Sequence, residues 1–135
     1  MLRWLIICIV ACLTGCASTA PGPDTSTWRY EAHQLTDADR SALDRGVRPL
    51  LRDPESARFG RAAARKLFMP GKQPILQVCG YVNARNGFGG YTGEQLFVGV
   101  LQLEGERAFK IIFMGGDQVS SFQATTLCQQ YGLLA

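Results

Sequence analysis

Three segments in the second half of the chain carry apolar side chains at both odd and even positions, and they constrain the fold most strongly. They span residues 75–83, 95–103 and 109–114. The first segment shows the pattern on both sides: Leu76, Val78 and Val82 alternate with Ile75, Cys79 and Tyr81. Strands of this kind are typical of a sheet whose two faces are both at least partly covered. The sequence around Gly105 predicts a tight turn between the last two strands.

A helix is predicted before these strands. Thr36 is followed three residues later by Asp39, which is a short-chain version of the capping box that begins helices. Pro49 lacks a backbone donor and should kink or end this helix, while Asp53 and Pro54 predict a second, short helical turn. Four apolar residues recur at the spacing of one helical face: Leu43, Val47, Leu50 and Leu51.

A second helix is predicted to close the chain, beginning at Ser120 or Ser121. Gly132 stands where a C-terminal cap is expected. The segment 59–68 is ambiguous, because three consecutive alanines favour a helix while a weak alternation favours a strand; we interpret it as an edge strand. The predicted inner face of the closing helix consists of Ala124, Leu127, Cys128 and Tyr131.

The first fifteen residues have the organisation of an export signal. Arg3 precedes an apolar run at 4–13, which is too short for a membrane-spanning helix of about 20 residues and fits the apolar region of a secretory signal. The run ends in Leu-Thr-Gly-Cys at 13–16, which resembles the bacterial lipobox. The resemblance implies cleavage after Gly15 and lipid attached to Cys16. An uncleaved signal anchor and a plain secretory signal are the alternatives.

Residues 16–27 are rich in Ser, Thr, Pro and Gly and have no hydrophobic period, so we expect a lipidated, flexible tether. Ala17 follows the lipobox cysteine, whereas an Asp at that position usually retains such lipoproteins at the inner membrane. The resemblance therefore implies attachment to the membrane through lipid on Cys16, in the outer membrane of the cell envelope and facing the periplasm.

The order of the elements predicts the fold class. Helices placed before and after a run of strands are typical of an α+β domain, not of alternating β-α-β units. About 120 residues remain after removal of 1–15, enough for one domain and too few for two. We expect a single small domain at 28–135 with a three- or four-stranded antiparallel sheet, flanked by an N-terminal and a C-terminal helix and tied by one disulfide.

The cysteines are separated by their positions. Two of the five lie within the predicted signal, and Cys16 takes the lipid. Cys79 and Cys128 remain as an even pair in an oxidising compartment, which favours a disulfide. On the chain-entropy model a loop of that length contributes about 4 kcal/mol to stability. Two buried free thiols are the alternative.

The loop 83–93 contains four glycines in eleven residues, interleaved with aromatic and polar side chains. It lacks the phosphate-binding glycine pattern, and Thr92 stands where a dinucleotide loop needs its third glycine. One interpretation is an ordered hairpin connection. The other is a recognition loop, in which exposed aromatic residues supply contact area at low entropic cost. The residues that the second interpretation requires are Asn83, Arg85, Asn86, Phe88 and Tyr91.

Two segments resemble a group of small exported proteobacterial proteins. These proteins share the pattern D-P-x-S-A-x-F, which matches 53–59 here, and the pattern C-G-x-V-N-x-x-N-x-x-G-G-Y-x-G, which matches 79–93. The likeness covers roughly the middle third of the chain. It implies a compact exported domain and transfers no catalytic residue.

The sequence predicts a binding protein and not an enzyme. The only histidine, His33, lies beside the tether and is expected to be solvated, and no set of residues suggests a metal site or cofactor. The main hypothesis is an accessory lipoprotein that binds an envelope protein through 83–93. The alternative is a binder of anionic surfaces or polymers through the basic segment 40–72, whose Arg40, Arg48 and Arg52 would share one helical stripe. Nucleic acid is not expected across a membrane, and the formal charge of +3 decides little.

Overall fold

A five-stranded antiparallel sheet in the order β1-β2-β3-β4-β5 organises residues 22–134, which are the residues that the computed structural model describes. The predicted signal and Cys16 lie outside the described residues. Two helices, α1 (Asp37–Val47) and α2 (Gln118–Gln130), accompany the sheet, together with the short 3-10 helices η1 (Arg48–Leu50) and η2 (Pro54–Ser56). The strands are β1 (Arg29–His33), β2 (Arg58–Phe68), β3 (Ile75–Asn83), β4 (Gln95–Gln102) and β5 (Phe109–Met114).

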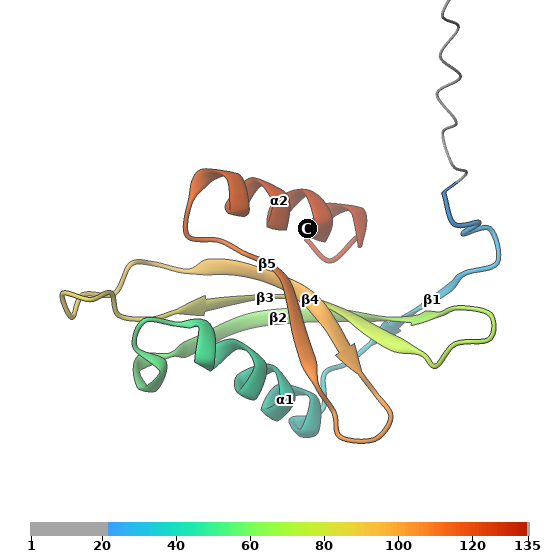
Figure 1. Ribbon diagram of the computed structural model, residues 1–135, viewed down its shortest axis with the longest axis horizontal. Helices are drawn as coiled ribbons and strands as arrows, with labels where there is room; N and C mark the ends of the chain where they lie inside the picture. Colours follow the sequence, from blue (N-terminus) through green and yellow to red (C-terminus); the bar gives the residue numbers. More distant parts are fainter. Residues whose placement is uncertain (1–21, 135) are drawn as a thin grey trace, which may run out of the picture.

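The two helices cover opposite faces of the sheet, which gives three layers (Figure 1). On the α1 side, Leu43 and Val47 pack into a core built around Phe97 of β4. On the α2 side, Ala124 and Cys128 pack against Val98. This arrangement confirms the expectation that strands apolar on both sides need cover on both faces.

The sheet has five strands, so the prediction of three or four was too low. The strand that was missed is β1, which is almost entirely exposed and has no apolar alternation. Because β1 pairs with residues 64–68 of β2, the prediction of an edge strand at 59–68 is wrong for that half of β2. The other half carries a bulge, in which Gly60 and Arg61 lie opposite Tyr81 alone.

The predicted helix at Thr36 is confirmed with its capping box. The Thr36 side chain accepts a hydrogen bond from the Asp39 backbone, and the Asp39 side chain accepts one from the Thr36 backbone. The α-helix ends at Val47, ahead of Pro49, as expected for a residue that cannot donate a backbone hydrogen bond. The short turn predicted after Asp53 is η2.

The closing helix begins earlier than predicted. It starts at Gln118, because the carboxylate of Asp117 accepts hydrogen bonds from the backbone of Val119 and Ser120 and caps the first turn. The predicted starts at Ser120 and Ser121 are therefore wrong by about half a turn. Gly132 follows the helix with a φ of 66°, as expected for a C-terminal cap.

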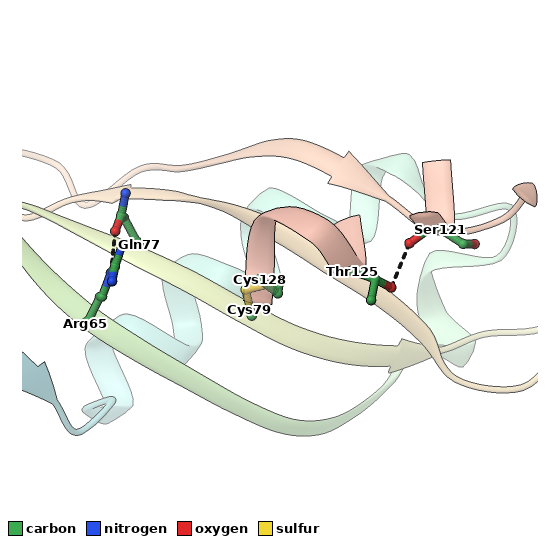
Figure 2. The surroundings of a disulfide bond; sticks show 6 residues. All are labelled: Arg65, Gln77, Cys79, Ser121, Thr125 and Cys128. Carbon is green, nitrogen blue, oxygen red and sulfur yellow. Dashed lines mark hydrogen bonds between the residues drawn. A yellow bond between two sulfur atoms is a disulfide. The ribbon is translucent and has the colours of Figure 1, made fainter. Parts of the chain in front are cut away.

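The disulfide is confirmed and joins β3 to α2. Cys79 and Cys128 have their Cα atoms 6.0 Å apart, and both side chains are buried (Figure 2). Ala124 and Cys128 of α2 are fully buried and Leu127 and Tyr131 pack against the same cluster, so the covalent bond adds to the apolar attachment of this helix. None of the helices between residues 22 and 134 has the length and apolar character needed to cross a membrane.

Candidate functional site

The loop 83–93 folds as a small hairpin beyond the ends of β3 and β4. Arg85 and Tyr91 form an isolated antiparallel bridge across it. At the tip, the Asn86 backbone donates to the Gly90 carbonyl at 2.8 Å, and the Gly89 backbone donates to the Asn86 carbonyl at 3.1 Å. The loop is therefore an ordered structure with its own backbone pairing.

The two asparagines of the loop are used internally. The side-chain oxygen of Asn86 accepts hydrogen bonds from the backbone of Phe88 at 2.9 Å and of Gly90 at 3.1 Å. The side-chain oxygen of Asn83 accepts one from the backbone of Gly93 at 3.2 Å. These hydrogen bonds to side-chain carbonyl oxygens stabilise the turn, as is common for asparagine in loops.

Ser56 of η2 fastens this hairpin to the rest of the domain. Its hydroxyl oxygen accepts a hydrogen bond from the Arg85 backbone at 2.8 Å and donates one to the Asp53 carbonyl, also at 2.8 Å. The Ser56 carbonyl accepts a hydrogen bond from the Tyr91 hydroxyl at 3.2 Å. The sequence predicted a short helical turn after Asp53 and gave no sign of this link between Ser56 and the loop.

The two aromatic residues of the loop have different environments. Phe88 is 99% exposed, whereas Tyr91 is 36% exposed. The Tyr91 ring lies beneath the guanidinium groups of Arg58 and Arg85, at 4.3 Å and 5.5 Å from its centroid. Tyr91 therefore supports the hairpin, and Phe88 alone projects from it.

A cleft of about 450 Å³ lies between the hairpin and the segment that follows α1. Leu50 and Arg52 line it on one side, and Arg85 and Phe88 line it on the other. Leu50 is itself exposed, and Arg52 and Arg85 add two positively charged residues to the lining. The predicted loop and one member of the predicted basic segment, which are distant in the sequence, meet at this place.

The other predicted basic residues do not form a common stripe with Arg52. Arg52 lies beyond the end of α1, so the four-residue spacing no longer places it above Arg48. Arg48 is occupied, because it donates to the Asp44 carboxylate at 2.6 Å and to the Pro54 carbonyl at 2.6 Å. Arg40 lies on α1 and lines a separate cavity. The prediction of a single basic helical face is wrong.

His33 is not the solvated residue that was expected. Its Nε2 lies 3.0 Å from a carboxylate oxygen of Asp39, which also accepts hydrogen bonds from the backbone and hydroxyl of Thr36. Arg107 contacts the other oxygen. Burial by itself raises the pKa of Asp39, but the hydrogen bonds from His33 and Thr36 and the charge of Arg107 outweigh it and lower the pKa to about 2. The cluster joins the end of β1, the start of α1 and the β4–β5 turn.

A second, more open cleft of about 810 Å³ lies on the α2 side of the sheet. Glu94 and Asp117 both line it, whereas Thr92 and Gln95 line this cleft and the first one. Within residues 22–134, no group of three His, Cys, Asp or Glu residues is placed to hold a metal ion. The end of the molecule that carries the hairpin thus has arginines on one side and carboxylates on the other.

A scan against models of protein families, a search of curated proteins and a search of solved structures each found no match to this chain. The resemblance to small exported proteins stays a prediction. Its two segments do contact each other, because Ser56 belongs to the first and its bonding partners Arg85 and Tyr91 belong to the second.

Proposed function

We propose that this protein is a membrane-anchored lipoprotein of the cell envelope that binds a partner protein through the hairpin 83–93 and has no catalytic activity. The observation that carries the proposal is the exposure of Phe88 on a braced loop. Burying an exposed phenylalanine side chain against a partner would contribute about 1.5–3 kcal/mol to the free energy of binding. Aromatic anchors of this kind tend to carry most of the energy of an interface.

The hydrogen bonds of the hairpin favour binding because they reduce its entropic cost. Immobilising a flexible loop opposes association, whereas a loop that is already ordered loses little on binding. Asn86 fixes the backbone of Phe88, and Ser56 fixes the base of the hairpin. Four glycines leave the surface around Phe88 free of bulky side chains.

The position of the hairpin also fits an anchored protein. The chain enters the sheet at Arg29, opposite Phe68, beside the turn between β2 and β3. The hairpin lies at the other end of the sheet (Figure 1). The nine residues of β3 connect the two ends, so they are about 30 Å apart. A tether attached at Cys16 would therefore enter the domain at the end opposite the hairpin, which would leave Phe88 free to meet a partner in the periplasm.

The alternative function is binding of an anionic surface or polymer. The observation that favours it is the presence of Arg52 and Arg85 at the same cleft. Within residues 22–134, neither guanidinium forms an ion pair with a carboxylate. Such binding would weaken steeply as salt screens the charges, whereas capture through Phe88 would change little.

Capture of crosslinked partners from intact envelopes tests the main proposal. Phe88→Ala should remove the captured partner while the melting temperature stays near that of the parent protein, because exposed positions contribute about 0.5 kcal/mol or less. The matched control is Phe122→Ala, which removes a phenylalanine that is 72% exposed on α2. Equal partner yield from both variants would leave the hairpin a structural connection and make the arginine cleft the better candidate.

A further inference from the structure

The first half of β2 is an open edge of the sheet. The pairing with β1 begins at Ala64 and continues to Phe68, so it leaves residues 58–63 uncovered. On one side, residues 58, 59, 62 and 63 pair with β3, and residues 60 and 61 form the bulge between them. On the other side, no backbone hydrogen bond from the rest of 22–134 reaches them. Unpaired backbone groups on such an edge are a template for another strand.

The side chains along this edge leave the backbone accessible. Ala62 and Ala63 are small, and Gly60 has no side chain. Arg61 lies in the bulge and is exposed, and its guanidinium lies 5.4 Å from the centroid of the Tyr81 ring. An added strand would therefore meet small residues at 60, 62 and 63 and larger side chains at 58, 59 and 61.

Two cavities flank the open edge on opposite faces of the sheet. On the α1 side, a cavity of about 200 Å³ is lined by Leu43 and Phe59 together with Arg40. On the α2 side, a cavity of about 170 Å³ is lined by Ala63 and the C-terminal Leu133. Successive side chains of an extended strand point to opposite faces. Two adjacent residues of an added strand would therefore each meet one cavity.

The charge around the edge selects the partner. Arg40, Arg58 and Arg61 are exposed there. Two carboxylates lie nearby: Asp44 is held by Arg48, and Glu94 lies against Gly60. The excess of positive charge favours an acidic segment. It opposes pairing with a second copy of this chain, which would place arginines beside arginines across a short edge.

We propose that residues 58–63 accept an extended, acidic segment of another polypeptide, which adds to β2 in line with β1. Backbone hydrogen bonds would supply affinity, and the two cavities would select two adjacent aliphatic side chains between acidic ones. This inference concerns a surface other than the hairpin and does not depend on a partner at Phe88.

Titration of the purified full chain with a designed peptide tests the inference. The probe is a capped six-residue peptide with two adjacent aliphatic residues flanked on each side by two glutamates. Two control peptides are matched to it: one has alternate backbone amides N-methylated, and the other has lysines in place of the glutamates. N-methylation removes main-chain donors without changing charge, so affinity should fall about tenfold or more if the peptide binds as a strand.

Arg61→Glu is the variant that tests the charge argument, with Lys110→Glu on β5 as the matched control. The loss of an attractive pair and the gain of a repulsive one should weaken binding of the probe by roughly fivefold for Arg61→Glu, and little for Lys110→Glu. Far-ultraviolet circular dichroism and melting should be unchanged in both variants.

Three outcomes would overturn the inference. Equal affinity for the N-methylated peptide would mean that charge alone attracts the probe. No binding of any peptide would mean that the bulge and arginines only guard the edge against pairing. A concentration-dependent dimer in sedimentation, altered by Arg61→Glu, would assign the edge to a second copy of this chain.

Discussion

The hydroxyl oxygen of Ser56 accepts a hydrogen bond from the Arg85 backbone at 2.8 Å, across 29 positions of the sequence. This bond joins a short helical turn to the base of the exposed hairpin. A residue outside the loop therefore helps to fix the position of the hairpin that carries Phe88. The structure of the hairpin therefore depends on η2 as well as on its own glycines and asparagines.

Ser56→Ala tests this dependence. Removing the hydroxyl leaves the exposed Arg85 amide to water and should lower the free energy of unfolding by about 0.5–1 kcal/mol. Amide hydrogen exchange at Arg85 should become faster than in the parent. Urea denaturation with Ser41→Ala, an exposed serine of α1, is the control. Unchanged exchange at Arg85 would contradict the role given to Ser56.

Reduction of the disulfide should release α2 more than any other element. The bond between Cys79 and Cys128 closes a separation of 49 residues, and its removal should cost about 4 kcal/mol on the chain-entropy model. Thiol titration under denaturing, non-reducing conditions should find neither cysteine free. Two titratable thiols in periplasmic material, or melting unaffected by reduction, would refute this prediction.

Asp39 should make the protein sensitive to acid at low pH. Its pKa is lowered from 3.8 to about 2 in the fold, so the ionised form stabilises the folded state. A shift of that size corresponds to about 2 kcal/mol, present above pH 4 or so and lost as the pH falls toward 2.

Asp39→Asn should therefore remove part of the acid-induced loss of stability between about pH 4 and pH 2, while lowering stability at neutral pH. Asp37→Asn, an exposed residue of the same first turn, is the matched control. Chemical denaturation at several pH values measures both. Parallel pH profiles for Asp39→Asn and the parent would show that the cluster with His33 and Arg107 does not set this dependence.

Cys16→Ser tests the proposed anchor. The lipobox resemblance predicts that the serine variant accumulates as unprocessed or soluble protein, because the thiol that would carry the lipid is absent. The intact mass of the mature chain extracted from membranes provides the measurement. A mature form of the unaltered protein that begins at Cys16 without added acyl mass would contradict the proposal.

Sequence periodicity was sufficient for the elements that are buried on a regular pattern. The strands β3, β4 and β5 were located because their apolar residues occupy both faces, and α1 because its capping box is local. The exposed strand β1 has no such signal, because only its pairing with β2 defines it. The start of α2 was misplaced because Asp117 was not considered as its cap.

The candidate site was predictable only in part. Local composition indicated an ordered loop with two aromatics, but the difference between Phe88 and Tyr91 depends on contacts with Ser56 and Arg58, which are distant in the sequence. The basic stripe failed because a helical spacing was extended past the end of α1 at Val47. The first failure reflects long-range packing, whereas the second was local, because Pro49 already predicted that the helix would not continue to Arg52.

Site-specific photocrosslinking in intact envelopes would show whether Phe88 contacts a partner protein. A photoreactive phenylalanine analogue would replace Phe88 in one variant and Phe122 in the other, since both side chains are exposed and neither supports the core. If Phe88 anchors a partner, position 88 should give a discrete adduct with one protein and position 122 should give none. No adduct from position 88, or the same adducts from both positions, would contradict it.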